Sequence, residues 1–231
     1  MSILVYIRIS KQIGAIIWFC IPMKESRRAS IGLDKRERTR AKLIESAYRV
    51  FARKAADAVT IDDIIAEAAV ARGTFYNYFQ TREDVLKAVA GNLSDEINQK
   101  IWVQYAEISD PAERLAIAIR QFLHQAIRDS TWGWVIVRIG LVAAPLSETM
   151  ERGMMTDLEA GIRLNRFQVD SLQAASDLVL GTGLMAIHSI LEGRAEPDYP
   201  EQIAKIILKT LGVNDADAHA IAFKFLEPLH S

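Results

Sequence analysis

The sequence contains little cysteine, proline or glycine. A single cysteine, Cys20, occurs among the 231 residues, so no disulfide can form within one chain and a reducing, cytoplasmic compartment is expected. The six prolines and twelve glycines stand mostly at the ends of apolar segments. No long stretch alternates between polar and apolar residues, as a half-buried β-strand would. These absences favour an all-α protein, with no internal repeat, low-complexity tract or Gly/Ser linker.

The sequence also lacks the common catalytic and metal-binding motifs. Its histidines are scattered, with no His-Glu-x-x-His pair and no cysteine pair. Gly181-Thr-Gly183 lies inside an apolar helical segment rather than after a strand, so it is not a phosphate-binding loop. We therefore expect no catalytic residue, no metal site and no cofactor.

The first 23 residues differ from the rest of the chain. An uncharged apolar run extends from Ile13 to Met23, after Arg8 and Lys11. It is too short for a membrane span, which needs about 20 apolar residues, and no small-x-small cleavage site follows it. We interpret residues 1–23 as an over-extended start, with translation beginning at Met23. The alternative is an amphipathic anchor lying in a membrane interface.

Helical spacing of apolar residues continues through the remaining chain, and caps and stop signals divide it. Half of the residues are hydrophobic, enough for the cores of one small module and one larger helical domain. The expected helices cover about 35–54, 61–68, 72–78, 82–105, 111–129, 131–143, 147–167, 170–192, 198–211 and 215–227.

Residues 60–81, TIDDIIAEAAVARGTFYNYFQT, predict two short helices joined by a tight turn at Ala69–Val70. Thr60 suits the N-cap of the first helix, and Asp63 three residues later can complete a capping box. Two packed helices with such a bend are the arrangement that places one helix in the major groove of DNA.

Aromatic residues on the second helix divide between two faces. Phe75 and Phe79 are four residues apart, so they share a face and are expected to close over the core. Tyr76, Asn77 and Tyr78 are then turned outward, where hydroxyl and amide groups can reach phosphates and base edges.

The residues of this region resemble the tetracycline-repressor (TetR) family of bacterial transcription regulators over about residues 38–90. The positions that carry the resemblance are Phe51, Thr60, Val70, Thr74, Phe75, Tyr76, Phe79 and Arg82. The resemblance implies two sets of contacts with double-stranded operator DNA. The set facing the bases comprises Arg72, Gly73, Thr74 and Asn77. The set holding phosphates comprises Thr60, Tyr76, Tyr78 and Arg82.

Three alanines depart from the family pattern. Ala55 and Ala69 stand where the family usually has glycine, and Ala71 stands where it often has a capping serine. Alanine is strained at positive φ, where glycine is not. Loss of the serine cap removes about 1 kcal/mol from the second helix.

Charge is distributed unevenly along the chain, although the net charge is only −1. Residues 24–54 carry eleven basic and four acidic side chains, whereas residues 91–231 carry 12 basic and 19 acidic ones. A basic end on an acidic body is typical of nucleic-acid binding. A flexible arm that could reach phosphates or the minor groove is expected to carry Arg27, Arg28, Lys35, Arg36 and Arg38. Lys42, Arg49 and Arg53 fit a solvated helix face instead.

The resemblance implies a helix-turn-helix DNA-binding domain over residues 24–80 and a helical effector-binding and dimerisation domain over residues 81–231. It implies a homodimer formed through the helices near 170–192 and 198–211, with Gly181 and Gly183 either allowing close packing or bending the helix. The function expected is that of a repressor released by a small effector. The alternatives are an activator, an effector-independent regulator, a small-molecule-binding module without DNA binding, or an all-α enzyme.

Helices of the second domain hold more aromatic residues and methionines than a simple bundle needs, together with a few polar groups. An apolar cavity with a few convergent polar groups is the usual form of a small-molecule site. We therefore expect an apolar or aromatic effector. The candidate effector-binding residues are Trp102, Tyr105, His124, Trp132, Arg138, Met154, Phe167 and His188. Ordinary core packing is the alternative role for each of them.

Overall fold

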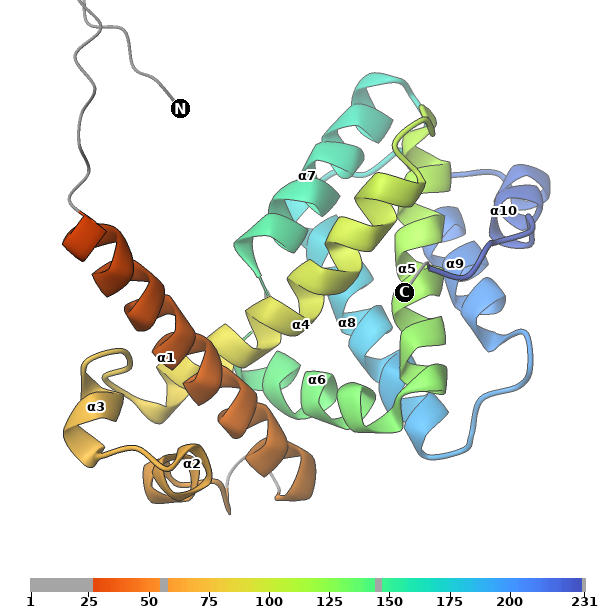
Figure 1. The fold of residues 1–231 in the computed structure, drawn as a ribbon. Helices are drawn as coiled ribbons and strands as arrows, with labels where there is room; N and C mark the ends of the chain where they lie inside the picture. The colour runs from red at the N-terminus through yellow and green to blue at the C-terminus, as the bar shows by residue number, and fades with distance from the viewer. Residues whose placement is uncertain (1–26, 55–57, 144–146, 230–231) are drawn as a thin grey trace, which may run out of the picture. The chain divides into compact units, whose positions relative to one another are not determined.

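The computed structural model describes residues 27–54, 58–143 and 147–229, and every regular element within these ranges is an α-helix (Figure 1). The all-α prediction is therefore confirmed. The chain divides into two compact units, Met1–Thr39 and Arg40–Ser231. The apolar leader over residues 1–23 and the departure at Ala55 lie outside the described residues.

The helices follow the predicted order closely. They are α1 (Arg27–Arg53), α2 (Ile61–Ala68), α3 (Arg72–Tyr76), α4 (Arg82–Gln104), α5 (Pro111–Arg128), α6 (Ser130–Ala143), α7 (Glu148–Arg163), α8 (Leu172–Leu191), α9 (Tyr199–Thr210) and α10 (Asp215–Ala222). Polar side chains cap many helix starts by accepting a hydrogen bond from a free backbone N–H. These caps are Thr60, Thr81, Asp110, Ser147, Ser171 and Asn214.

Several helix ends differ from the prediction. Helix α1 begins at Arg27, so the expected flexible arm is wrong for the described residues: Arg27, Arg28 and the basic residues after them are helical. Helix α3 ends at Tyr76, two residues early, and α10 ends at Ala222 rather than near residue 227. Local spacing continues past these ends because it does not record where a chain turns to meet its neighbours.

Helix α7 ends at Arg163, four residues before the predicted end. Asn165 adopts a left-handed backbone with φ 55°, which reverses the chain. The N–H groups of Arg166 and Phe167 then both donate to the carbonyl of Gly161. The Phe167 ring packs where a Cβ on residue 161 would stand, so glycine is required there.

Buried side chains of Arg40–Ser231 form one hydrophobic cluster that extends from Leu43 to Ala222. In its N-terminal part, α1, α2 and α3 meet through Phe51, Ile64 and Phe75, which are fully buried. In the remainder, α5 is central and packs against α4, α6, α7, α8, α9 and α10. Helix α4 leads from the α2–α3 pair into this larger bundle (Figure 1). The domain boundary at residues 80–81 stays a prediction.

Candidate DNA-binding surface and ligand cavity

The turn between α2 and α3 is closed by backbone hydrogen bonds and one left-handed residue. Ala69 has φ 48° and ψ 52°. Its N–H donates to the carbonyl of Ala66 at 3.2 Å, and the N–H of Val70 donates to the carbonyl of Ile65 at 3.3 Å. These bonds satisfy carbonyls at the end of α2 and bring α3 back across it. The tight turn predicted at Ala69–Val70 is therefore present, with alanine in a conformation that favours glycine.

Side chains of α3 and the residues after it divide between the core and the surface. Phe75 and Phe79 are 0% and 4% exposed, with ring centroids 5.8 Å apart, as the sequence predicts. Tyr76 is 38% exposed, and Asn77 is also exposed. Tyr78 differs from the prediction, because it is half-buried and packs against the core. The outward surface is thus smaller than the sequence suggests.

The first turn of α3 is open to a partner. Ala71 precedes it in an extended conformation and supplies no side-chain cap. A Cβ added at Gly73 would meet no atom within 4 Å, and Thr74 is half-buried beside it. Arg72 donates to Asp62 at 2.8 Å, and its guanidinium lies 6.0 Å from the centroid of the Tyr76 ring.

Both ends of the α2–α3 segment are held by capping boxes. The Thr60 hydroxyl accepts from the N–H of Asp63, and the Asp63 carboxylate accepts from the N–H of Thr60 at 3.0 Å. The predicted capping box is therefore present. The same arrangement recurs at the start of α4, between Thr81 and Asp84, which sequence reasoning missed although Thr-x-x-Asp is a recognisable signal. Next to it, Arg82 donates to the carbonyl of Val59 at 3.4 Å.

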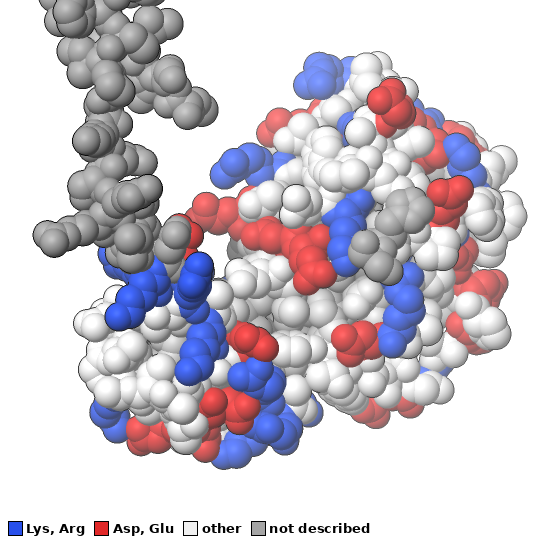
Figure 2. Space-filling view, in the orientation of Figure 1, with Lys and Arg blue, Asp and Glu red and all other residues white. Residues whose placement is uncertain are grey.

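Several basic side chains of α1 are engaged in holding α2. Arg49 and Arg53 both donate to Glu67, at 2.8 Å and 2.5 Å, and Lys54 donates to Asp63 at 2.7 Å. For Arg49 and Arg53 the contacts are thus structural. Lys42 remains exposed on the same helix. Figure 2 shows many basic side chains, with a few acidic ones among them, on the lobe that contains α2, α3 and the end of α1, whereas the larger bundle carries both kinds.

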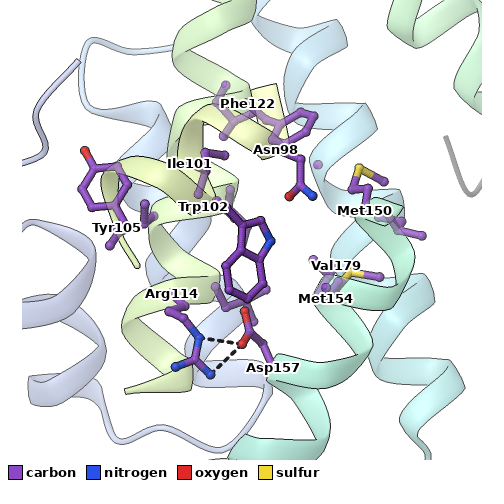
Figure 3. Close-up of a pocket in the computed structure, with 18 of the residues that line it drawn as sticks. Asn98, Ile101, Trp102, Tyr105, Arg114, Phe122, Met150, Met154, Asp157 and Val179 are labelled. Atoms are coloured by element: carbon purple, nitrogen blue, oxygen red, sulfur yellow. Dashed lines mark hydrogen bonds and ion pairs between the residues drawn. The ribbon is translucent and has the colours of Figure 1, made fainter. Parts of the chain in front are cut away.

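A cavity of about 130 Å³ lies among α4, α5, α6, α7 and α8. Its wall is mostly apolar (Figure 3). The apolar and aromatic lining includes Ile101, Trp102, Tyr105, Ile117, Phe122, Ile136, Met150, Met154, Val179 and Leu184. Of the predicted effector residues, Trp102, Tyr105 and Met154 line this cavity. Gly183 of α8 also lines it.

Three polar side chains that sequence reasoning missed also line the cavity: Asn98, Arg114 and Asp157. Arg114 donates to Asp157 through Nε at 2.7 Å. Burial raises the pKa of Asp157, and the neighbouring guanidinium only partly offsets this rise. Asn98 stands next to Ile97 and one turn before Ile101, so a polar residue on an apolar face was a usable signal. No signal in the sequence indicated that Arg114 pairs with Asp157.

Two of the predicted polar effector residues have protein partners outside the cavity lining. The His124 ring nitrogen lies 3.3 Å from Glu201, and burial lowers the pKa of His124. Arg138 of α6 donates to the carbonyls of Phe51 and Lys54, at 3.0 Å and 3.3 Å. Each of these two side chains therefore has a polar partner within the protein, away from the cavity lining.

The other three predicted effector residues also lie outside the cavity lining. The Trp132 ring is 3% exposed and packs beside Phe122 with ring centroids 6.0 Å apart. Phe167 fills the space over Gly161. His188 meets the Trp134 ring edge-on at 5.8 Å, and Arg194 lies 3.1 Å from its Nδ1. Among the described residues, no group of three His, Cys, Asp or Glu side chains is placed to hold a metal ion.

Comparison with known protein families matches two segments of the chain to TetR-type domains. Residues 43–89 match the family described as bacterial regulatory proteins, tetR family, and residues 110–224 match the tetracyclin repressor-like C-terminal domain. The solved structure of RolR in complex with resorcinol is 31% identical and superposes with a TM-score of 0.69. That match covers 86% of this chain and 100% of the RolR chain.

Curated relatives match over shorter segments. The regulator HbdR of Aromatoleum sp. (strain CIB) is 32% identical over 97 residues, 41% of this chain and 42% of HbdR. An uncharacterised HTH-type transcriptional regulator of Mycobacterium tuberculosis is 28% identical over 89 residues, 38% of this chain and 44% of that protein. The matches span less than half the length of these relatives. Both domain matches and the similarity to RolR over 86% of the chain show that the chain belongs to the TetR family of bacterial regulatory proteins.

Proposed function

We propose that this protein is a cytoplasmic, homodimeric, DNA-binding transcription regulator, a repressor that a small apolar effector releases from its operator. One observation carries the proposal. Helix α4 begins three residues after Phe79, and the same helix lines the cavity through Asn98, Ile101 and Trp102. A ligand in the cavity therefore presses on the helix that directly follows the DNA-reading segment.

On the DNA side, Arg72, Gly73, Thr74 and Asn77 face the bases. The Arg72–Asp62 pair does not oppose this role, because both side chains are more than half exposed and such pairs contribute about 0–1 kcal/mol. A base or phosphate can replace Asp62 as the partner of Arg72. Tyr76 and Arg82 hold phosphates, with Thr60 and Tyr78 beside them.

Recognition through one short helix buries little surface, so two half-sites on a symmetric dimer are required for useful affinity. The two recognition helices must then be spaced by about 34 Å or a multiple of it. Displacement of α4 by an effector changes this spacing and releases the DNA. RolR is solved with resorcinol, a single-ring compound, and the cavity of about 130 Å³ here has room for one ring.

The primary test is a mobility-shift assay with the DNA flanking the protein's own gene, followed by random-site selection. We expect binding to a palindrome and higher transcription of a reporter when the regulator is deleted. Binding to no DNA in either assay would contradict the proposal.

A double variant tests the phosphate contacts. Tyr76→Phe combined with Arg82→Ala should weaken binding to every DNA sequence, because phosphate contacts do not depend on sequence. The slope of log affinity against log salt should fall by about one for the lost cationic contact. Arg152→Ala, an exposed arginine on α7, is the matched control and should change neither quantity. An unchanged salt slope in the double variant would remove these residues from the interface.

A further inference from the structure

Asn98 is a buried amide without a hydrogen-bond partner. Its residue is 9% exposed, and no described residue forms a hydrogen bond with its side chain. Figure 3 shows the amide reaching into the space beside Trp102 and Met150. Leaving a buried amide unpaired costs about 1–3 kcal/mol. A bound molecule with a polar group at this position would remove that cost.

A second polar group at the cavity without a partner among the described residues belongs to the Arg114–Asp157 pair, and it is a carboxylate oxygen of Asp157. Both Nε and Nη2 of Arg114 lie 2.7 Å from the same oxygen, Oδ1 of Asp157. Its Nη1 donates to the carbonyls of Ile108 and Ser109, at 3.0 Å and 2.9 Å. All three nitrogens of the guanidinium are therefore engaged by the protein. No donor from a described residue reaches Oδ2 of Asp157, which remains a charged acceptor at the cavity wall.

These contacts define what the cavity accepts. An acceptor oxygen requires a donor, and a hydroxyl is the simplest neutral donor on a small apolar molecule. A carboxylate would place a second negative charge against Asp157, with no free cation to neutralise it. The volume of about 130 Å³ resembles that of an engineered cavity of about 150 Å³ that binds benzene.

We infer that the effector is an uncharged single-ring compound with a hydroxyl that donates to Oδ2 of Asp157 and a second polar group that pairs with the amide of Asn98. This inference rests on the proposed effector function and specifies its ligand class. Trp102, Phe122, Met150 and Met154 surround the ring, while the Arg114–Asp157 pair excludes anions. Asp157 and Asn98 are thus the residues that determine specificity.

Three probes test the ligand class by tryptophan fluorescence, since Trp102 lines the cavity. Resorcinol carries two hydroxyls, 1,3-difluorobenzene replaces them with groups of similar size that cannot donate, and benzoate carries a negative charge. We expect resorcinol to bind about tenfold or more tightly than 1,3-difluorobenzene. Benzoate should not bind measurably. The fluorinated probe is the more apolar, so the hydrophobic effect alone predicts the opposite order.

Two variants assign the preference to residues. Asp157→Ala should reduce the preference for resorcinol and admit benzoate, because the guanidinium of Arg114 becomes available to the anion. This gain of binding cannot come from misfolding. Asn98→Leu should weaken resorcinol binding about tenfold and leave 1,3-difluorobenzene binding unchanged. Glu159→Ala, an exposed acid on the same helix as Asp157, is the control and should behave like the wild type.

The outcomes separate this inference from the proposed function. The ligand class is wrong if 1,3-difluorobenzene binds as tightly as resorcinol. It is also wrong if benzoate binds the wild-type protein as tightly as it binds the Asp157→Ala variant. In both cases the cavity remains a ligand site. If no probe changes the fluorescence, the ligand class is also wrong. The DNA-binding function is decided separately by the mobility-shift assay. If the three probes bind in the expected order of affinity and resorcinol also releases the DNA, the ligand class and the proposed function are both supported.

Discussion

Ala69 shows how one residue can place strain at a functional turn. A non-glycine residue in the left-handed region is disfavoured by about 1–2 kcal/mol because its Cβ crowds the following carbonyl. Here the buried contacts of Ile64 and Ala68 on α2, together with Phe75 on α3, hold the turn in place. The strain lies directly beside the proposed DNA-reading surface. It is a local cost that the surrounding core offsets.

Replacing Ala69 with glycine should stabilise the protein by about 1 kcal/mol, because glycine tolerates positive φ. For a chain of this length the gain corresponds to a rise in Tm of about 2–4 °C, measurable by thermal denaturation. The matched control is Ala66→Gly inside α2, which should destabilise by about 1 kcal/mol. Equal destabilisation by both substitutions would show that the turn is not strained.

At the scale of helices, α6 links the cavity to the end of α1. Ile136 of α6 lines the cavity, while Arg138 two residues later donates to the carbonyls of Phe51 and Lys54. The last carbonyls of a helix lack partners within it, so a guanidinium there satisfies them and favours the helix dipole. Its guanidinium also lies 5.4 Å from the centroid of the Trp134 ring. We therefore expect a movement of α6 to be transmitted to α1 through this contact.

Arg138→Met keeps much of the apolar stem but removes the donors. Resorcinol affinity measured by fluorescence should stay unchanged, whereas the ability of resorcinol to weaken operator binding should fall several-fold, about 1 kcal/mol of coupling. Arg128→Met, at the exposed end of α5, serves as the control. A full ligand response in Arg138→Met would show that α6 transmits nothing through this contact.

The capping box at the start of α2 makes the stability of the protein depend on pH. Hydrogen bonds from Lys54 and from the backbone and hydroxyl of Thr60 lower the pKa of Asp63 to about 2. A carboxyl group whose pKa is lowered by folding stabilises the protein above its unfolded pKa of about 4. This contribution is lost as the pH falls from about 4 to about 2.

The difference in Tm between the wild type and Asp63→Ala should therefore be present at pH 7 and shrink as the pH falls through this window. Circular dichroism melts at several pH values measure it. Asp62→Ala removes an exposed carboxylate from the same turn without touching the cap, so it controls for charge. A difference that stays constant down to pH 2 would contradict the role of the capping box.

At the scale of the whole molecule, α8 and α9 leave apolar surface uncovered. Helix α8 has the length and hydropathy of a membrane span, yet only 28% of that window is buried within the chain. Met185 on α8 is 56% exposed and Ile206 on α9 is 55% exposed. Large exposed apolar side chains on adjacent helices mark an interaction surface. A second copy of the chain can cover it, in agreement with the proposed homodimer.

Met185→Glu or Ile206→Glu should yield monomers in sedimentation experiments, because a buried unpaired charge at the interface is strongly unfavourable. Both should also lose high-affinity operator binding, since one half-site alone is weak. Val103→Glu places a charge on an exposed apolar residue of α4 and should leave the dimer intact. Gly183→Leu is less informative, because Gly183 lines the cavity. A dimer that survives both α8 and α9 variants would place the interface elsewhere.

Local sequence signals determined the helical class, the order of helices and the helix-turn-helix segment. Caps, prolines and apolar periodicity act over three or four residues, so Thr60, Asp110 and the Phe75–Phe79 pair could be read directly. The same signals extended α7 too far, because the left-handed Asn165 is decided by Phe167 packing on Gly161.

Only the tertiary structure decided which residues form the cavity. The bond between Arg114 and Asp157 joins residues 43 positions apart on two helices, and no local pattern predicts that pairing. Arg138 and His124 are equally conspicuous on apolar helices, but their partners lie 87 and 77 residues away, outside the cavity. Helical periodicity shows which face of a helix is buried. Which buried polar groups meet each other, and which remain free for a ligand, depends on how the helices pack.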